Sequence, residues 1–152
     1  MRNPGLSLPQ QALALKSVYD TSRLRLGPTS LVWSGHLQPS ALSERYLIEV
    51  SLKDGNRPVV KVIAPALMPD EKGSLPHIWE DGSLCLNTAE QWTSKMLLVD
   101  TIIPWSSEWL FHYEAWRGTG IWFGDGPSAE HPDAQAQLLH PANLVRAQNI
   151  GD

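Results

Sequence analysis

The sequence predicts a single α+β domain, in which an antiparallel β-meander is flanked by an N-terminal helix and by C-terminal helices. Apolar and polar residues alternate along 45–52, which indicates a half-buried strand, and the Asp54-Gly55-Asn56 turn leads from it into another apolar run over 58–63. Aromatic residues then recur at helical spacing along 106–117. A chain of 152 residues, 42% of them hydrophobic, has the size and apolar content of one packed domain.

The first half of the chain contains the predicted N-terminal helix and the meander. Residues 8–16 predict a short amphipathic helix with Pro9 in its first turn. Gly27-Pro28 separates this helix from the meander. The expected strands are 30–37, 45–52 and 58–63. Residues 64–76 carry three prolines and one glycine, so we expect a long surface loop there.

The second half predicts two helices. Thr93 is expected to cap a helix over about Ser94–Ile103, which Pro104 interrupts. A second helix is expected over about Ser106–Arg117. One face of this region is aromatic and apolar, and we expect it to pack against the sheet. Its members are Trp105, Trp109, Leu110, Tyr113 and Trp116.

Glycines mark the end of the helical region. Gly118 and Gly120 are expected to end the second helix, and 121–132 form a second glycine-rich loop. The predicted domain core spans about 8–131, and 132–152 form a C-terminal extension in which 141–148 can be helical.

Composition excludes several classes of function. Net charge is −4 and there is no cluster of Lys or Arg, so no nucleic-acid surface is expected. No apolar run approaches the ~18 residues that span a bilayer, and 1–10 lack a signal-peptide core, so the expected location is the cytoplasm without membrane association. One cysteine permits neither an internal disulfide nor a multi-cysteine zinc site. We expect no metal or cofactor and interpret His36, His112 and His140 as surface or helix-face residues.

The stretch with the clearest chemistry is 75–86, LPHIWEDGSLCL. Asp81-Gly82 predicts a turn between two short extended arms, with Cys85 between two leucines on the second arm and His77 eight residues before it. A reachable thiol beside hydrogen-bond donors is what acyl transfer through a thioester requires. The stretch contains no Lys or Arg, so we expect a modestly reactive thiol. The alternative is a small buried cysteine that fills a strand.

The order of the elements, together with this motif, resembles the ubiquitin-conjugating enzyme (UBC) family over roughly Leu8 to His131. Residues 81–86, DGSLCL, are similar to the family's D-G-x-[I/L/V]-C-L around its catalytic cysteine. Trp92-Thr93 resembles the tryptophan that precedes the helix after the active site. The resemblance implies a UBC-like fold with Cys85 as the thioester-forming nucleophile.

One position departs from the ordinary family pattern. Ordinary members carry His-Pro-Asn ending eight residues before the cysteine, whereas this chain has Leu75-Pro76-His77. The family's asparagine supports the active-site loop and is assigned to oxyanion stabilisation. His77 can donate a hydrogen bond in its place, act as a base, or cap the loop backbone, and the sequence leaves these three roles open.

A closer resemblance is to the UBC-like proteins of bacterial antiphage operons, the short type II CBASS systems. It is carried by residues 75–77, 84–86, TIIPWSSEWLFHYEAW at 101–116 and the glycine-rich segment 119–126. The resemblance implies a thioester between Cys85 and the C-terminal glycine of a cGAS-like nucleotidyltransferase encoded beside it, without a separate activating enzyme. Where a run of glycines is expected, this chain has Gly-Asp-Gly at 124–126.

Further candidates for an active-site loop are Asp81, Ser83, Asp125 and His131. Two alternatives to a Cys85 transferase remain open. One is a non-catalytic binding module of the same fold, which the retained cysteine disfavours, and the other is a hydrolase that uses Cys85 with His77. The chain ends in Ile-Gly-Asp instead of Gly-Gly, so it does not resemble a ubiquitin-type modifier, and the sequence does not identify the target lysine.

Overall fold

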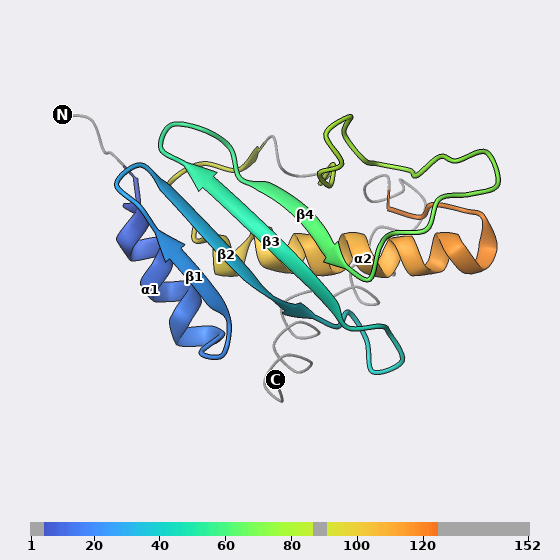
Figure 1. Ribbon diagram of the computed structural model, residues 1–152, viewed down its shortest axis with the longest axis horizontal. Helices are drawn as coiled ribbons and strands as arrows, with labels where there is room; N and C mark the ends of the chain where they lie inside the picture. Colours follow the sequence, from blue (N-terminus) through green and yellow to red (C-terminus); the bar gives the residue numbers. More distant parts are fainter. Residues whose placement is uncertain (1–4, 87–90, 125–152) are drawn as a thin grey trace.

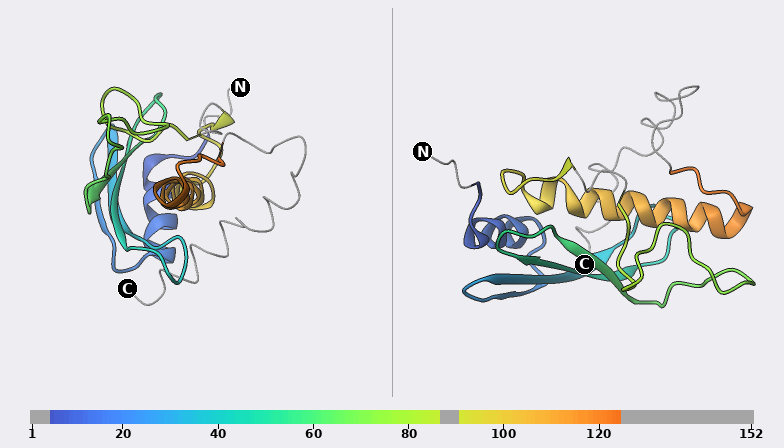
Figure 2. Two further views of the ribbon diagram at one scale, coloured as in Figure 1. Left: turned by 90° about the vertical axis from the view of Figure 1, so that its right-hand side faces the viewer. Right: turned by 90° about the horizontal axis from the view of Figure 1, so that it is seen from above.

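The computed structural model describes residues 5–86 and 91–124, and within them it confirms the α+β class and the UBC-like arrangement (Figure 1). In chain order the elements are α1 (Leu8–Val18), β1 (Arg23–Leu26), β2 (Ser30–Leu37), β3 (Tyr46–Lys53), β4 (Val59–Ala64), the 3₁₀ helix η2 (Leu98–Asp100) and α2 (Ile102–Thr119). The four strands form one antiparallel sheet in the order β1-β2-β3-β4. Both α-helices lie against the same face of this sheet (Figure 2).

Helix α1 begins where the sequence predicts and extends two residues further than 8–16. Ser7 and Gln10 form a capping box: the Gln10 amide donates to Ser7 Oγ at 3.2 Å, and the Ser7 amide donates to Gln10 Oε1 at 2.8 Å. The buried side of the helix carries Leu8, Gln11, Ala12 and Leu15. Gln11 binds backbone groups of the segment before α2, because its Nε2 donates to the carbonyl of Met96 and its Oε1 accepts from the amide of Leu98, both at 2.8 Å.

All three predicted strands are present, and the sheet gains a fourth. Tyr46, Ile48, Val50 and Leu52 of β3 face the core, as the alternation predicts. β1 is a mostly exposed edge strand of four residues, which offers little apolar signal in the sequence. Gly27-Pro28 is therefore part of the turn that joins β1 to β2, where the Gly27 amide donates to the Ser30 carbonyl at 2.8 Å.

Of the two helices predicted in the second half, the one over 106–117 is confirmed as part of the 18-residue α2. The one over 94–103 is wrong, because only the short η2 and the first two residues of α2 lie there. Pro104 lies in the first turn of α2, where a missing amide hydrogen breaks no helical hydrogen bond. Thr93, the predicted N-cap, directly precedes no helix, because η2 begins at Leu98. Buried Trp92 instead donates from Nε1 to Thr101 Oγ1 at 3.2 Å, next to the start of α2.

Helix α2 supplies the apolar face that the sequence predicts. Trp109, Leu110 and Tyr113 are buried, whereas Trp105 and Trp116 are half-buried and pack against the core. The helix ends at Gly120, whose left-handed φ of 78° favours glycine, while Gly118 lies inside the last turn.

The loop predicted over 64–76 has no regular structure beyond the last residue of β4. It is tied to α2 by the amide of Met68, which donates to Tyr113 Oη at 2.7 Å. The predicted terminal helix over 141–148, the extension 132–152, and His140 lie outside the described residues. Within the described part of the chain, no helix is both long and apolar enough to cross a membrane.

Candidate functional site

Cys85 lies on the second arm of a short hairpin, residues 77–85, which we call the cysteine hairpin. Ile78 and Leu84 form an isolated antiparallel bridge. The Trp79 amide donates to the Ser83 carbonyl at 2.9 Å, and the Cys85 amide donates to the His77 carbonyl at the same distance. The predicted pair of extended arms is therefore confirmed.

The turn of the hairpin is built by three successive residues. Gly82 has a φ of 86°, which favours glycine, and its amide donates to the Trp79 carbonyl at 2.9 Å. Asp81 Oδ1 accepts from the Ser83 hydroxyl at 2.6 Å and from the Ser83 amide at 2.9 Å. These hydrogen bonds, the hydroxyl one first, lower the pKa of the Asp81 carboxyl below its usual value. Asp81 and Ser83 thus shape the turn that precedes the thiol.

The cysteine hairpin is fixed to the sheet and to the core. The Leu84 amide donates to the Val60 carbonyl of β4 at 2.9 Å. Leu84 and Leu86 are both buried, and Cys85 between them is partly exposed. Alternation along the arm therefore directs both leucines inward and leaves the thiol partly accessible. A partly exposed thiol meets the first requirement of a nucleophile and disfavours the alternative of a fully buried strand residue.

His77 occupies an unusual backbone conformation at the base of the hairpin. Its φ is 51°, in the left-handed region where Asn, Asp and His are enriched among non-glycine residues. Its carbonyl accepts two hydrogen bonds, one from the Cys85 amide at 2.9 Å and one from Trp109 Nε1 at 3.1 Å. The main chain of His77 thus joins the hairpin to α2, in a conformation that histidine and asparagine both tolerate.

The imidazole of His77 stacks on an aromatic ring that sequence reasoning missed. The Trp122 ring lies 4.7 Å from the His77 ring, centroid to centroid, at an angle of 24°. Trp122 also lies 5.3 Å from Trp109 and 5.7 Å from His112. Two sequence features could have indicated this contact. A tryptophan follows the helix-ending Gly120 by two residues, and the i, i+3 spacing of Trp109 and His112 puts both on one face of α2.

Of the two alternatives for His112, a surface or a helix-face residue, the second is confirmed: His112 lies on a face of α2, which is buried, and is only 4% exposed. It lies on α2 beneath residues 122–124, and a Cβ on Gly124 would lie 2.6 Å from His112 Cδ2. His112 Nε2 is 3.7 Å from Glu108 Oε1, which is too long for a hydrogen bond. Burial follows from the chain folding back after Gly120, which the helical pattern alone does not reveal.

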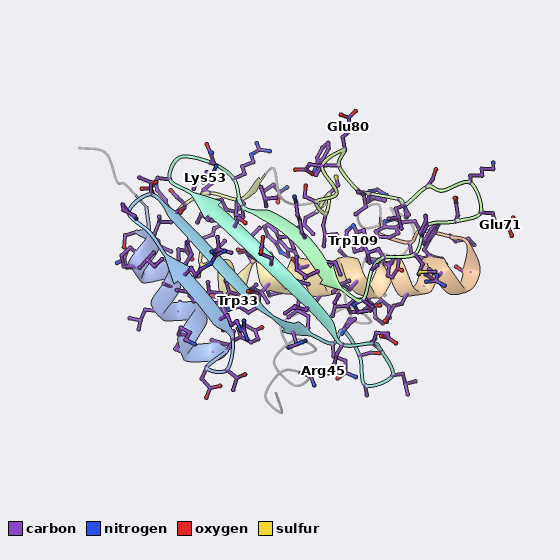
Figure 3. All side chains as sticks on the ribbon, in the orientation of Figure 1. Trp33, Arg45, Lys53, Glu71, Glu80 and Trp109 are labelled. Atoms are coloured by element: carbon purple, nitrogen blue, oxygen red, sulfur yellow. The ribbon has the colours of Figure 1, made fainter. Side chains whose placement is uncertain are left out.

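The outer side of the site is exposed. Trp79 is 58% exposed on the first arm, and Glu80 at the tip of the hairpin points away from the body of the protein (Figure 3). Glu71 projects from the far end of the preceding loop (Figure 3). The hairpin itself carries two acidic residues and no Lys or Arg. The exposed end of the cysteine hairpin therefore presents an aromatic ring and negative charge.

Two of the predicted site residues cannot be placed. Asp125 and His131 lie outside the described residues, as does most of the second glycine-rich loop. The structure brings Cys85, His77, Asp81 and Ser83 together in one hairpin. In the described ranges 5–86 and 91–124, no group of three or more His, Cys, Asp or Glu residues could hold a metal ion.

Comparison with known proteins agrees with this geometry. The sequence model of one protein family, described as Type II CBASS E2 protein, matches residues 11–130, which is more than half of the chain. The match includes the whole sheet, the cysteine hairpin and α2. A comparison with curated proteins finds no match to this chain.

Proposed function

Because the chain belongs to the type II CBASS E2 family, whose name marks E2-like proteins of antiviral defence, we propose that it is a transferase that carries an acyl group as a thioester on Cys85. The single observation that carries this proposal is the partly exposed thiol on a hairpin arm whose neighbouring leucines are both buried. A nucleophilic sulfur needs exposure, and transfer needs a fixed backbone around it.

The reaction has two steps. The Cys85 thiolate attacks the carbonyl carbon of an activated acyl group, a C–S bond forms, and the activating group leaves with its electron pair. An amine then attacks the thioester carbonyl, the C–S bond breaks, the amine loses a proton, and an amide and the free thiol result. Both steps pass through a tetrahedral intermediate with negative charge on oxygen, which hydrogen-bond donors stabilise.

Two groups near Cys85 are candidates for the hydrogen-bond donor that stabilises the oxyanion. The amide of Cys85 itself is engaged with the His77 carbonyl, so it is not aimed at an oxyanion on the acyl group. His77 pairs with Cys85 across the hairpin. Its imidazole has one N–H to donate in the neutral form. We assign His77 the role of oxyanion donor, with base catalysis as the alternative that the pH dependence separates.

The acyl donor that we propose is the C-terminal glycine of a cGAS-like nucleotidyltransferase. A C-terminal glycine has no side chain, so its carbonyl can approach a thiol that is only partly exposed between two buried leucines. The family assignment supports a role in CBASS, where such an enzyme is the expected neighbour of this chain. The acceptor in the second step is then a lysine of a target protein.

The proposed thioester is tested by looking for a covalent adduct of the two proteins. Incubation with the nucleotidyltransferase and an activating reagent for its C-terminus should give a species that thiol reductant removes. Cys85→Ser should form a reductant-resistant ester or no adduct, because oxygen is the poorer nucleophile and its ester is harder to cleave. An adduct that persists in Cys85→Ala would assign the chemistry to another residue.

Two further outcomes separate the alternatives. Tight binding of the nucleotidyltransferase without any adduct would identify a non-catalytic binding module. Release of the free carboxylate without an added amine, at a rate that amine does not increase, would identify a hydrolase. Alkylation of native protein by a small maleimide is the control, because a Cys85 that reacts only after unfolding would be a core residue.

A further inference from the structure

After α2 the chain reverses at Gly120 and runs back along the helix, as Figures 1 and 2 show. We call residues 120–124 the return segment. It carries Trp122 onto His77 of the cysteine hairpin, so residues 45 positions apart in the chain stack face to face at 4.7 Å. The imidazole of His77, the residue whose carbonyl binds the Cys85 amide, is therefore covered by a different part of the chain from the one that holds its backbone.

Trp122 is held in place by rings. It packs against Trp109 at 5.3 Å and 57°, and against His112 at 5.7 Å and 45°. Both of these residues come from α2, so Trp122 lies between the helix and the hairpin. Trp122 Nε1 and His112 Nε2 are buried and have no hydrogen-bond partner among the described residues. Aromatic packing, not hydrogen bonding, therefore fixes the position of the Trp122 ring there.

Gly124 allows this packing. An added Cβ would lie 2.6 Å from His112 Cδ2, 2.8 Å from His112 Cγ and 2.8 Å from Trp122 Nε1. Each distance is shorter than a carbon side chain tolerates, and the His112 ring is buried, so it has little room to move aside. Gly124 is not in the left-handed region, so the need for glycine here comes from close approach alone.

We propose that Trp122 is a positioning residue for the chemistry at Cys85, because it stacks on the imidazole of His77, which pairs with Cys85 across the hairpin, and holds that imidazole in one orientation. This inference rests on the proposed function. The hydrogen bonds at the His77 carbonyl fix the main chain, and packing against a ring restricts rotation about the side-chain bonds. The nearly parallel Trp122 ring supplies that restriction. A donor that is oriented before the acyl group arrives needs no reorganisation in the transition state.

The first test compares Trp122→Phe, which keeps a stacking ring, with Trp122→Leu, which keeps apolar volume and loses the ring. The first readout is the proton resonance of His77 Cε1–H, which the ring current of a stacked indole shifts upfield. Trp122→Leu should abolish this shift, and Trp122→Phe should retain part of it.

The second readout is single-turnover discharge of the Cys85 thioester onto free lysine. Trp122→Leu should slow discharge by about ten- to a hundredfold, since small misplacements of a catalytic group cost this much. The lysine concentration for half-maximal rate should stay unchanged. Trp122→Phe should restore most of the rate, which a merely space-filling role would not predict because leucine also fills space.

A matched pair of glycine variants tests the same inference without touching a ring. Gly124→Ala should displace the return segment, move the His77 resonance and slow discharge as Trp122→Leu does. Gly118→Ala is the control, since Gly118 is exposed, has no atom within 4 Å of an added Cβ and lies in a helix where alanine is favoured. It should discharge at the wild-type rate.

The outcomes separate the two proposals. A wild-type protein that forms no Cys85-dependent adduct overturns the proposed function, and the positioning role with it. A normal wild-type adduct combined with wild-type discharge in folded Trp122→Leu or Gly124→Ala overturns the positioning role alone. Should Trp122→Leu fail to fold, an unmoved His77 resonance and an unchanged rate in Gly124→Ala still reject it.

Discussion

The two segments that meet at His77 are held in opposite ways. The cysteine hairpin is held by hydrogen bonds, which join its arms to each other, to β4 through Leu84 and to α2 through the His77 carbonyl. The return segment places Trp122 by ring contacts, and two buried nitrogens in those contacts have no hydrogen-bond partner among the described residues. Hydrogen bonds thus fix the main chain around Cys85, while the Trp122 ring packs against the imidazole of His77. Substitutions in the two segments should therefore have different consequences.

The largest effect is expected at Trp109, where the two modes of attachment meet. Trp109 is 4% exposed, packs against Trp122 and donates to the His77 carbonyl. Trp109→Ala should lower the free energy of unfolding by ~3–5 kcal/mol, which approaches the whole stability of a typical domain. Chemical denaturation measures this loss, and poor solubility of the variant would be its extreme form.

Two variants sharpen this prediction. Trp116→Ala is the matched control, since Trp116 is on the same helix but only half-buried, and its loss should be clearly smaller. Trp109→Phe keeps an aromatic ring and removes the hydrogen bond to His77, so it should cost less than the alanine variant and loosen the hairpin. A soluble Trp109→Ala protein that melts as wild type and only fails to bind its partner would show that the aromatic face of α2 is a docking surface.

The next largest effect is expected for substitutions of His77, which should change the rate of transfer from Cys85. The φ of 51° decides which variants are informative, because Asn and Gly adopt this conformation readily and Ala does not. His77→Gly removes the imidazole with little backbone strain and should slow single-turnover transfer by ~10²–10³, the value of one oxyanion donor. His77→Asn should retain most of the activity, because its amide restores a donor.

Other results at His77 would reassign it. If His77 acts as a base, His77→Asn should be as slow as His77→Gly, and the wild-type rate should show a pH dependence that both variants lack. Near-wild-type rates in both variants would leave His77 as loop structure only. His77→Ala should be less stable than His77→Gly, and a reversed order would contradict the role of the left-handed backbone.

The sequence predicts the hydrogen-bonded half of the site better than the packed half. The Asp81-Gly82 turn, the leucines that flank Cys85 and the strands β2 to β4 follow from patterns within a few residues, and the structure confirms them. The contact between His77 and Trp122 joins distant segments, so no local period reveals it. The burial of His112 and the left-handed φ of His77 have the same origin, since both are consequences of tertiary packing.

The predicted helix boundaries were wrong and the edge strand β1 was not predicted, and each has its own physical reason. Proline is a reliable break only in a helix interior, and Pro104 lies in the first turn of α2. β1 is short and exposed, so its register with β2 is set by the sheet and not by an apolar face of its own. Sequence patterns therefore locate buried elements well and misjudge elements whose positions are set by their neighbours.

The smallest effect is expected at the tip of the cysteine hairpin, where Asp81 accepts two hydrogen bonds from Ser83. These bonds favour the ionised carboxylate, so the pKa of Asp81 in the folded protein lies below the value of 3.8 for an unperturbed group. A lowered pKa contributes stability that is fully present above the unfolded value and is lost as pH falls through the folded value. The stability difference between wild type and Asp81→Asn should therefore be constant near neutral pH and shrink below pH ~4, because asparagine does not titrate. Urea denaturation across this range measures the difference, and Ser83→Ala, which removes one of the two bonds, should give a shallower dependence. A difference that is independent of pH would mean that Ser83 does not stabilise the charged form, and the tip would then be shaped by Gly82 alone.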